Sequence, residues 1–192
     1  SPDILKEDPG KLLKRKKIEE FDRKQGAPMV WEELYYGNLK VETRGVGLLD
    51  GGRDLAQALK ENWPFPFGDD EPLKVYHSRA ALLNRYNVPN NCPIFTGEML
   101  EIFFQCICTG IDSLKELRVK SLEEHIDDQL GANDRAIMDA YVPLNLELKN
   151  GKGLRVHYPG DKEPWAEILI QDCFGLKETP TILQGKHPVI LH

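Results

Sequence analysis

The chain has 192 residues, 25 Lys and Arg against 31 Asp and Glu, a formal net charge of −6 and 41% hydrophobic residues. This composition excludes a wholly disordered chain, because enough apolar side chains are present to build a core. No stretch approaches the roughly 20 consecutive apolar residues that span a bilayer, so no membrane partner is expected. The length fits two small domains.

The cysteines and histidines show no spacing typical of a metal site. Cys106 and Cys108 lie in one apolar run, Cys92 and Cys173 stand alone, and neither Cys-x-x-Cys nor His-Glu-x-x-His occurs. No metal is therefore expected. Unpaired thiols and the lack of a secretory leader pattern favour a cytoplasmic location.

Residues 1–27 are predicted to be a basic leader. Their basic run, KLLKRKK, covers residues 11–17. It fits either a solvated lead-in segment or an arm that contacts nucleic acid. The acidic net charge of the chain favours the first interpretation.

Residues 28–62 carry strand signals followed by a short helix. Between Met29 and Val46, β-branched and aromatic residues flank Gly37-Asn38, a pattern that predicts two strands joined by a turn. Residues 54–62 have the apolar spacing of an amphipathic helix.

Residues 63–93 are predicted to be an aromatic and proline-rich junction with a helix. The prolines in WPFPFGDDE, residues 63–71, exclude a helix interior. The aromatic side chains either pin this loop to a core or offer a surface to a peptide or to bases. The helix predicted over residues 76–86 stops before Pro89.

Residues 94–141 are predicted to be helical. Thr96 can cap a strongly apolar helix that Gly110 ends, and Ser121 with Glu124 forms the pattern of a capping box. The cluster of His125, Asp127 and Asp128 fits either acid–base chemistry or a solvated helix face, and the second is favoured.

After Pro143 the pattern indicates strands. Alternating apolar residues predict a hairpin over residues 144–158, with Asn150-Gly151 in its turn. A helix is expected over residues 163–174, with Trp165, Leu169 and Phe174 in the core. A second hairpin is expected from residues 181–183 and 189–191. The predicted fold class is therefore α+β.

Motifs for nucleotide chemistry are absent from the sequence. Gly185-Lys186 is followed by His187, without the serine, threonine or upstream glycine of a P-loop. No catalytic residue is assigned, and this fragment is expected to be non-catalytic and to hold no cofactor. A free-standing hydrolase that uses His125 or His157 stays as an alternative.

The C-terminal half resembles the C-terminal region of the HrpB-type DEAH-box ATP-dependent helicases. The resemblance is clear over residues 94–192, the predicted helicase C-terminal domain, and faint before them. It rests on the segment from Phe174 to Pro180 and on the GKHPVILH run that begins at Gly185. The motif residues are Phe174, Gly175, Leu176, Glu178, Thr179, Pro180, Gly185 and Pro188.

This resemblance implies that the strands within residues 28–62 belong to a small β-barrel-like part similar to an oligonucleotide-binding (OB) fold. Aromatic side chains there would stack on bases and basic ones would meet phosphates, or the aromatic ones would fill the barrel interior. The candidates are Trp31, Tyr35, Tyr36, Lys40 and Arg44. Where the relatives carry a strongly basic helix, residues 129–140 have one arginine, Arg135, so contact there is not expected.

The resemblance also implies a function. The chain would be an accessory region of an ATP-dependent helicase, an NTP hydrolase, that braces the motor and guides single-stranded RNA or DNA. The motor domains, with ATP and Mg²⁺, would lie upstream and be the chain's first partner. The alternative is a protein–protein interaction module that binds no nucleic acid, which the net charge of −6 favours.

Overall fold

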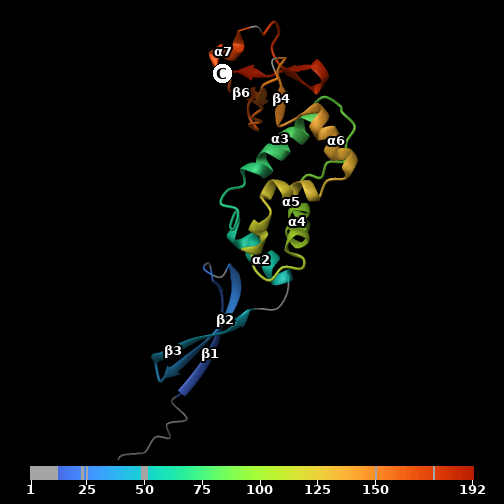
Figure 1. Ribbon diagram of the computed structural model, residues 1–192. Coiled ribbons are helices and arrows are strands. Elements are labelled where there is room, and N and C mark those ends of the chain that lie inside the picture. Colours follow the sequence, from blue (N-terminus) through green and yellow to red (C-terminus); the bar gives the residue numbers. More distant parts are fainter. Residues whose placement is uncertain (1–12, 23, 25, 49–51, 150, 175) are drawn as a thin grey trace, which may run out of the picture. The chain divides into compact units, whose positions relative to one another are not determined.

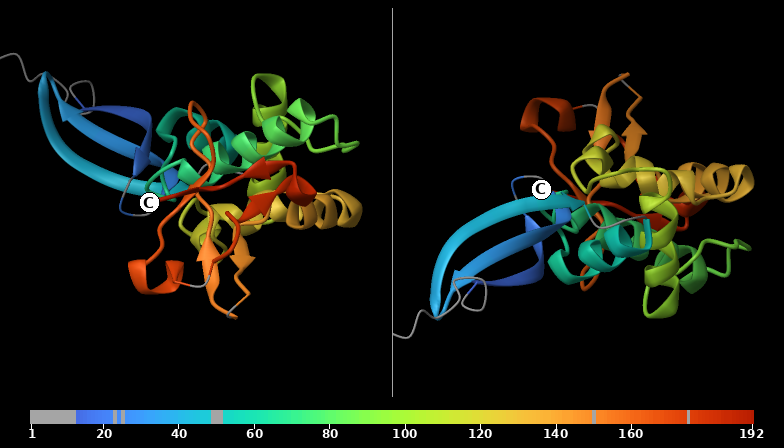
Figure 2. Two further views of the ribbon diagram at one scale, coloured as in Figure 1. Left: turned by 90° about the horizontal axis from the view of Figure 1, so that it is seen from above. Right: turned by 90° about the horizontal axis from the view of Figure 1, so that it is seen from below.

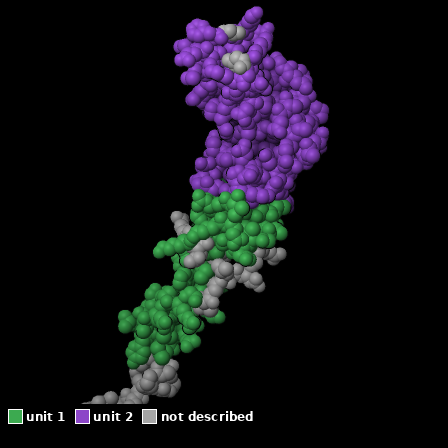
Figure 3. Space-filling model, viewed as in Figure 1, with its two compact units in different colours: residues 1–66, 104–119 green, residues 67–103, 120–192 purple. Residues whose placement is uncertain are grey.

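The computed structural model describes residues 13–22, 24, 26–48, 52–149, 151–174 and 176–192. The chain divides into two compact units, residues 1–66 with 104–119 and residues 67–103 with 120–192 (Figure 3). The boundary predicted between residues 93 and 94 lies inside the second unit. Helices and strands occur together, which confirms the α+β class.

The first unit contains a three-stranded antiparallel sheet in the order β1-β2-β3 (Figure 1). Its strands are β1 (Leu13–Asp22), β2 (Ala27–Tyr36) and β3 (Leu39–Leu48), and Figure 2 shows them running side by side. The turn at Gly37 and Asn38 between β2 and β3 was predicted, and Gly37 adopts a φ of 59° there.

Strand β1 lies within the predicted basic leader. Residues 13–22 pair with β2 along their whole length, from Leu13 opposite Tyr36 to Asp22 opposite Ala27. Most of its side chains are exposed, so the strand lacks the alternation of apolar residues by which a half-buried strand is recognised. Residues 1–12 of the predicted leader lie outside the described residues.

The described strands do not close into the predicted barrel. The sheet has three strands joined in sequence order, and it is open. Closure needs more strands with a consistent tilt and stagger, so a three-stranded meander stays open. Helix α2 (Gly52–Asn62) contributes Leu55 and Leu59 to the core of this unit.

The aromatic and proline-rich segment after α2 is non-helical, as predicted. Within the first unit, the rings of Trp63 and Phe104 have centroids 5.0 Å apart. Phe65 makes an edge contact with Phe21, with the centroids 5.8 Å apart. These contacts support the interpretation that the loop is pinned to a core.

The helices of the second half follow the predicted order. They are α3 (Glu71–Arg85), α4 (Glu98–Cys108), the 3₁₀ helix η1 (Glu116–Val119), α5 (Leu122–Asp128) and α6 (Ala132–Tyr141). Helix α3 begins earlier than predicted because Pro72 is accommodated in its first turn. Phe103 and Phe104 in α4 are buried.

The strands of the second unit are short. The predicted first hairpin is confirmed as β4 (Asn145–Glu147) paired with β5 (Gly153–Arg155). Strand β7 (Thr181–Ile182) pairs across the 3₁₀ helix η2 (Leu183–Gly185) with β8 (His187–Pro188). Strand β9 (Ile190–Leu191) instead pairs in parallel with β6 (Trp165–Ala166), so the predicted second hairpin is only partly right.

The helix predicted over residues 163–174 is wrong. Only α7 (Ile170–Cys173) is helical there. The amide of Trp165 donates to His157 and that of Ile168 donates to His192, so these groups are used in long-range pairing. Leu169 and Phe174 are 68% and 80% exposed, which corrects their assignment to the core.

Candidate nucleic-acid interface

The strand register decides which of the predicted binding residues share a surface. Residues opposite one another in an antiparallel pair lie on the same face of a sheet. Tyr35 is opposite Lys14 on β1 and Lys40 on β3, and Trp31 is opposite Ile18 and Gly45. We call the face that carries Trp31, Tyr35, Lys14, Lys16 and Lys40 the aromatic–lysine face.

The two remaining candidates lie on the opposite face. Arg44 is opposite Glu32, and Tyr36 is opposite Leu13 and Leu39. Tyr36 and Leu39 are 49% and 69% exposed. The structure therefore brings Trp31, Tyr35 and Lys40 together, and it separates Tyr36 and Arg44 from them.

Trp31 lies over a position without a side chain. A Cβ atom on Gly45 would stand 3.4 Å from the indole ring of Trp31. The glycine therefore leaves room for the large ring beside the neighbouring strand. Trp31 is half-buried, so part of its ring is accessible from solvent.

Glu33 connects two of the candidates. The hydroxyl of Tyr35 donates to one oxygen of the Glu33 carboxylate at 2.7 Å, and the ammonium of Lys40 donates to the other at 2.8 Å. These hydrogen bonds, first that of Lys40, lower the pKa of Glu33 below its ordinary value, and Glu33 in turn raises the pKa of Lys40. Sequence reasoning missed Glu33, because an acidic residue is no signal for phosphate binding.

The family-motif residues lie at turns and strand pairs of the second unit. The amide of Val189 donates to the carbonyl oxygen of Pro180 at 2.9 Å, Pro188 lies in β8 and Gly185 adopts a φ of 89°. Glu178 and Thr179 are exposed. These positions indicate a structural role for the turn residues, since left-handed backbone favours glycine.

The start of this motif is an exposed segment. Phe174 is largely exposed, and the amide of Leu176 donates to the carbonyl oxygen of Cys173 at 3.1 Å. Gly175 lies outside the described residues. Leu169 and Ile170, which precede it in the chain, are also largely exposed.

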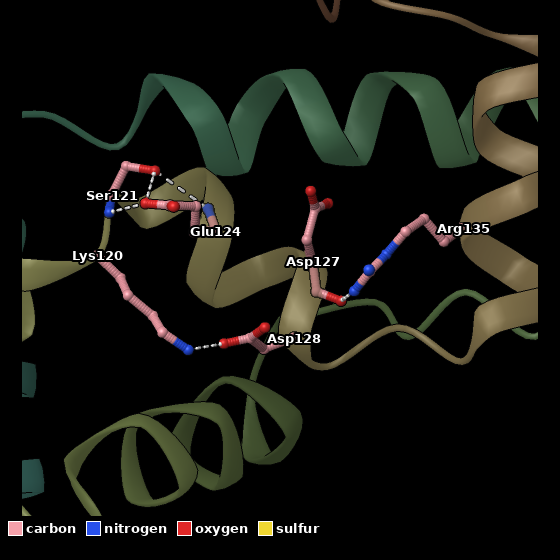
Figure 4. Close-up of polar contacts among 6 residues, drawn as sticks. All are labelled: Lys120, Ser121, Glu124, Asp127, Asp128 and Arg135. Carbon is pink, nitrogen blue, oxygen red and sulfur yellow. Dashed lines mark hydrogen bonds and ion pairs between the residues drawn. The ribbon is translucent and has the colours of Figure 1, made fainter.

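The alternative acid–base cluster on α5 does not converge. In Figure 4 the carboxylates of Asp127 and Asp128 point in different directions, and Asp128 forms an ion pair with Lys120. Arg135 donates to the carbonyl oxygen of Asp127. Burial raises the pKa of Asp127, whereas the hydrogen bond from Lys120 lowers that of Asp128. The arrangement does not favour acid–base chemistry. Of the helix face that was predicted to be solvated, Asp128 is exposed, whereas His125 and Asp127 are half-buried.

A buried polar cluster in the second unit was not predicted. His187 is 6% exposed, and its Nδ1 atom lies 2.6 Å from the hydroxyl oxygen of Tyr86. Its Nε2 atom lies at ion-pair distance, 2.9 Å, from the carboxylate of Glu163, without good hydrogen-bond geometry. Three distant segments supply these residues, so no sequence spacing could have revealed them.

The described residues contain neither a metal-binding cluster nor a membrane-spanning helix. No group of three or more His, Cys, Asp or Glu side chains in the described ranges could hold a metal ion. No helix in that part of the chain is long and apolar enough to cross a bilayer.

The comparisons with known proteins agree with one another. The family model for the ATP-dependent helicase C-terminal domain, HrpB_C, matches residues 103–192. The ATP-dependent RNA helicase HrpB of Escherichia coli (strain K12) is 25% identical to the chain over 191 residues, which cover 94% of this chain and 23% of that protein. The chain resembles the C-terminal region of HrpB-type helicases.

Two crystal structures of HrpB from E. coli share the fold. One, described as a DExH-box NTPase, has a TM-score of 0.63 and 21% identity over 95% of this chain and 23% of that one. The other, described as a DEAH/RHA helicase, has a TM-score of 0.62 and 20% identity over 94% of this chain and 24% of its own. The structural likeness therefore includes the β1–β3 sheet, where the sequence resemblance was faint.

Proposed function

We propose that the chain is the accessory C-terminal region of an HrpB-like ATP-dependent helicase and that its β1–β3 sheet guides a nucleic-acid strand. It spans 23% of the length of the E. coli helicase it matches. In this proposal the remaining part of the parent protein binds ATP and Mg²⁺ and hydrolyses the ATP. The present region packs against that part and stabilises it, and the whole protein works in the cytoplasm.

The observation that carries the guiding role is the composition of the aromatic–lysine face. Trp31 and Tyr35 stand on the same side of the sheet as Lys14, Lys16 and Lys40. Single-strand-binding surfaces combine aromatic rings, on which bases stack, with cations that follow the phosphates. The opposite face carries Arg15, Lys17 and Arg44 beside Glu19, Glu32 and Glu42. The aromatic–lysine face carries Glu20, Asp22 and Glu33 beside its three lysines, so it differs in the pairing of Trp31 and Tyr35 with lysines and not in net charge.

A matched pair of charge reversals tests this role. Lys14→Glu with Lys16→Glu changes the aromatic–lysine face, and Arg15→Glu with Lys17→Glu makes the same charge change on the other face of the same strand. Labelled single-stranded RNA and DNA would be titrated at low and moderate salt. Binding that weakens with salt and is lost only in the first variant supports the proposal. Equal loss in both variants, or no binding by the wild type at low salt, contradicts it.

The second candidate function is a protein–protein interaction module. It is favoured by the exposed apolar side chains around α7, those of Leu169, Ile170 and Phe174. Surfaces of this kind mark contacts with other proteins. This function would be favoured if the chain bound no nucleic acid but bound a helicase core, and if substitution of these three residues weakened that binding.

A further inference from the structure

The aromatic–lysine face has a carboxylate at its centre. Glu33 lies on β2 between Trp31 and Tyr35, and Lys16 stands opposite it on β1. Glu33 is only 7% exposed. A negative charge on a surface that binds phosphates repels them, so Glu33 opposes binding unless its charge is compensated.

The contacts of Glu33 use the groups that the strand would need. Lys40 donates to one carboxylate oxygen at 2.8 Å and Tyr35 to the other at 2.7 Å. The hydrogen bond from Lys40 is the first cause of the lowered pKa of Glu33, so the carboxylate is charged at neutral pH. In the unbound chain the charge of Lys40 is therefore already compensated.

Lys40 and Glu33 differ in accessibility. The side chain of Lys40 is 52% exposed, whereas that of Glu33 is 10% exposed. A lysine carries its ammonium on a flexible stem with several rotatable bonds. Lys40 can therefore turn toward a phosphate on the sheet surface while the carboxylate stays in place.

We propose that Glu33 is an internal competitor of the nucleic-acid phosphates, which holds Lys40 in the unbound chain and releases it when a strand occupies the aromatic–lysine face. The inference rests on the proposed function. Its consequence is that Glu33 weakens binding, because the ion pair between Lys40 and Glu33 must break before Lys40 can contact a phosphate. Weak binding suits a surface along which a nucleic-acid strand has to move.

Glu33→Gln tests the proposal. The amide has the shape of the carboxylate and can still accept from Tyr35, but it removes the charge that holds Lys40. The control is Glu32→Gln, which makes the same change in net charge one residue away, on the opposite face, where Glu32 lies 4.0 Å from Arg15. A third variant combines Glu33→Gln with Lys40→Gln.

Affinity for single-stranded RNA and DNA would be measured over a range of salt concentrations, with thermal unfolding of each variant as the check on folding. Releasing one exposed ion pair should tighten binding by roughly two- to fivefold. This gain should be absent from Glu32→Gln and should disappear in the double variant.

The outcomes separate the inference from the proposed function. Wild-type binding with no difference between Glu33→Gln and Glu32→Gln overturns the role of Glu33 and leaves the strand-guiding role intact. No binding by any variant at low salt overturns both. If Glu33→Gln does not fold, Glu33→Asp replaces it; the shorter carboxylate reaches Lys40 less well, so a smaller gain in affinity is expected and its absence overturns the role.

Discussion

The Nε atom of Arg79 on α3 donates a hydrogen bond of 2.7 Å to the carbonyl oxygen of Val142, the residue that follows α6. Arg79 is 7% exposed and Val142 is fully buried. A second nitrogen of the guanidinium lies 3.4 Å from Asp139, whose side chain is largely exposed. This contact joins two helices that are far apart in the sequence but packed together in the second unit.

Arg79→Met is expected to lower the free energy of unfolding by about 1 to 3 kcal/mol, because it leaves the buried carbonyl group of Val142 without a donor. The control is Arg85→Met, which removes an exposed ion pair with Glu163 and should cost less than about 1 kcal/mol. Urea unfolding measures both. Equal losses of unfolding free energy in the two variants would show that the buried hydrogen bond contributes no more to stability than the exposed ion pair.

Phe103→Ala is expected to destabilise the chain by about 3 to 5 kcal/mol, because this side chain is almost completely buried in α4. Phe174→Ala removes the same group from an 80% exposed position and should change stability by less than about 0.5 kcal/mol. Thermal or chemical unfolding compares the two variants. A large loss for Phe174→Ala would show that this ring is covered in solution.

Ser121→Ala is expected to cost about 0.5 to 2 kcal/mol, because the Ser121 hydroxyl caps the first turn of α5. Ser78→Ala is the control, since that hydroxyl donates to the carbonyl oxygen of Lys74 in the interior of α3 and caps no helix. An unchanged unfolding midpoint for Ser121→Ala would contradict the assigned cap.

The same capping box predicts a pH dependence. The amide and hydroxyl of Ser121 lower the pKa of Glu124 below its ordinary value of 4.5. A group whose pKa is lower in the folded state adds stability above its ordinary value and loses it as the pH falls through the lowered pKa. Wild type and Glu124→Gln should therefore differ most at neutral pH and converge in acid. A constant difference in unfolding free energy down to acid pH would refute this link.

Trp31→Ala should weaken single-strand binding by about 1 to 3 kcal/mol, the range for loss of one stacked base. Tyr36→Ala, on the opposite face of the same strand, should leave affinity unchanged. Both variants would be titrated with labelled strands after a check of their unfolding transitions. Weakening by Tyr36→Ala alone would place the binding surface on the other face.

Local signals in the sequence were sufficient to predict many of the turns, caps and hairpins of the fold. The turn at Gly37 and Asn38, the cap at Ser121 and the first hairpin of the second unit each depend on a few neighbouring residues. Such contacts are chosen by backbone and side-chain geometry within one turn, so a single sequence records them.

The grouping of the candidate binding residues on the two faces of the sheet could not be predicted. Lys40 and Arg44 are four residues apart, and regular alternation would put them on one face. The pairing with β2 shifts register between Leu34 and Tyr35, so Val41 is an extra residue and the two cations lie on opposite faces. A bulge depends on the partner strand, which the sequence of β3 alone does not reveal.

The parallel pairing of β6 with β9 fixes the order in which parts of the second unit can fold during synthesis. Trp165 and Ala166 find their partners in Ile190 and Leu191, so β6 cannot complete its hydrogen bonds until those later residues have left the ribosome. Until then Val189, fully buried in the finished fold, is also missing from its core. Nascent chains that stop before residue 189 should accordingly remain sensitive to protease at β6, even where α3 to α6 have already formed.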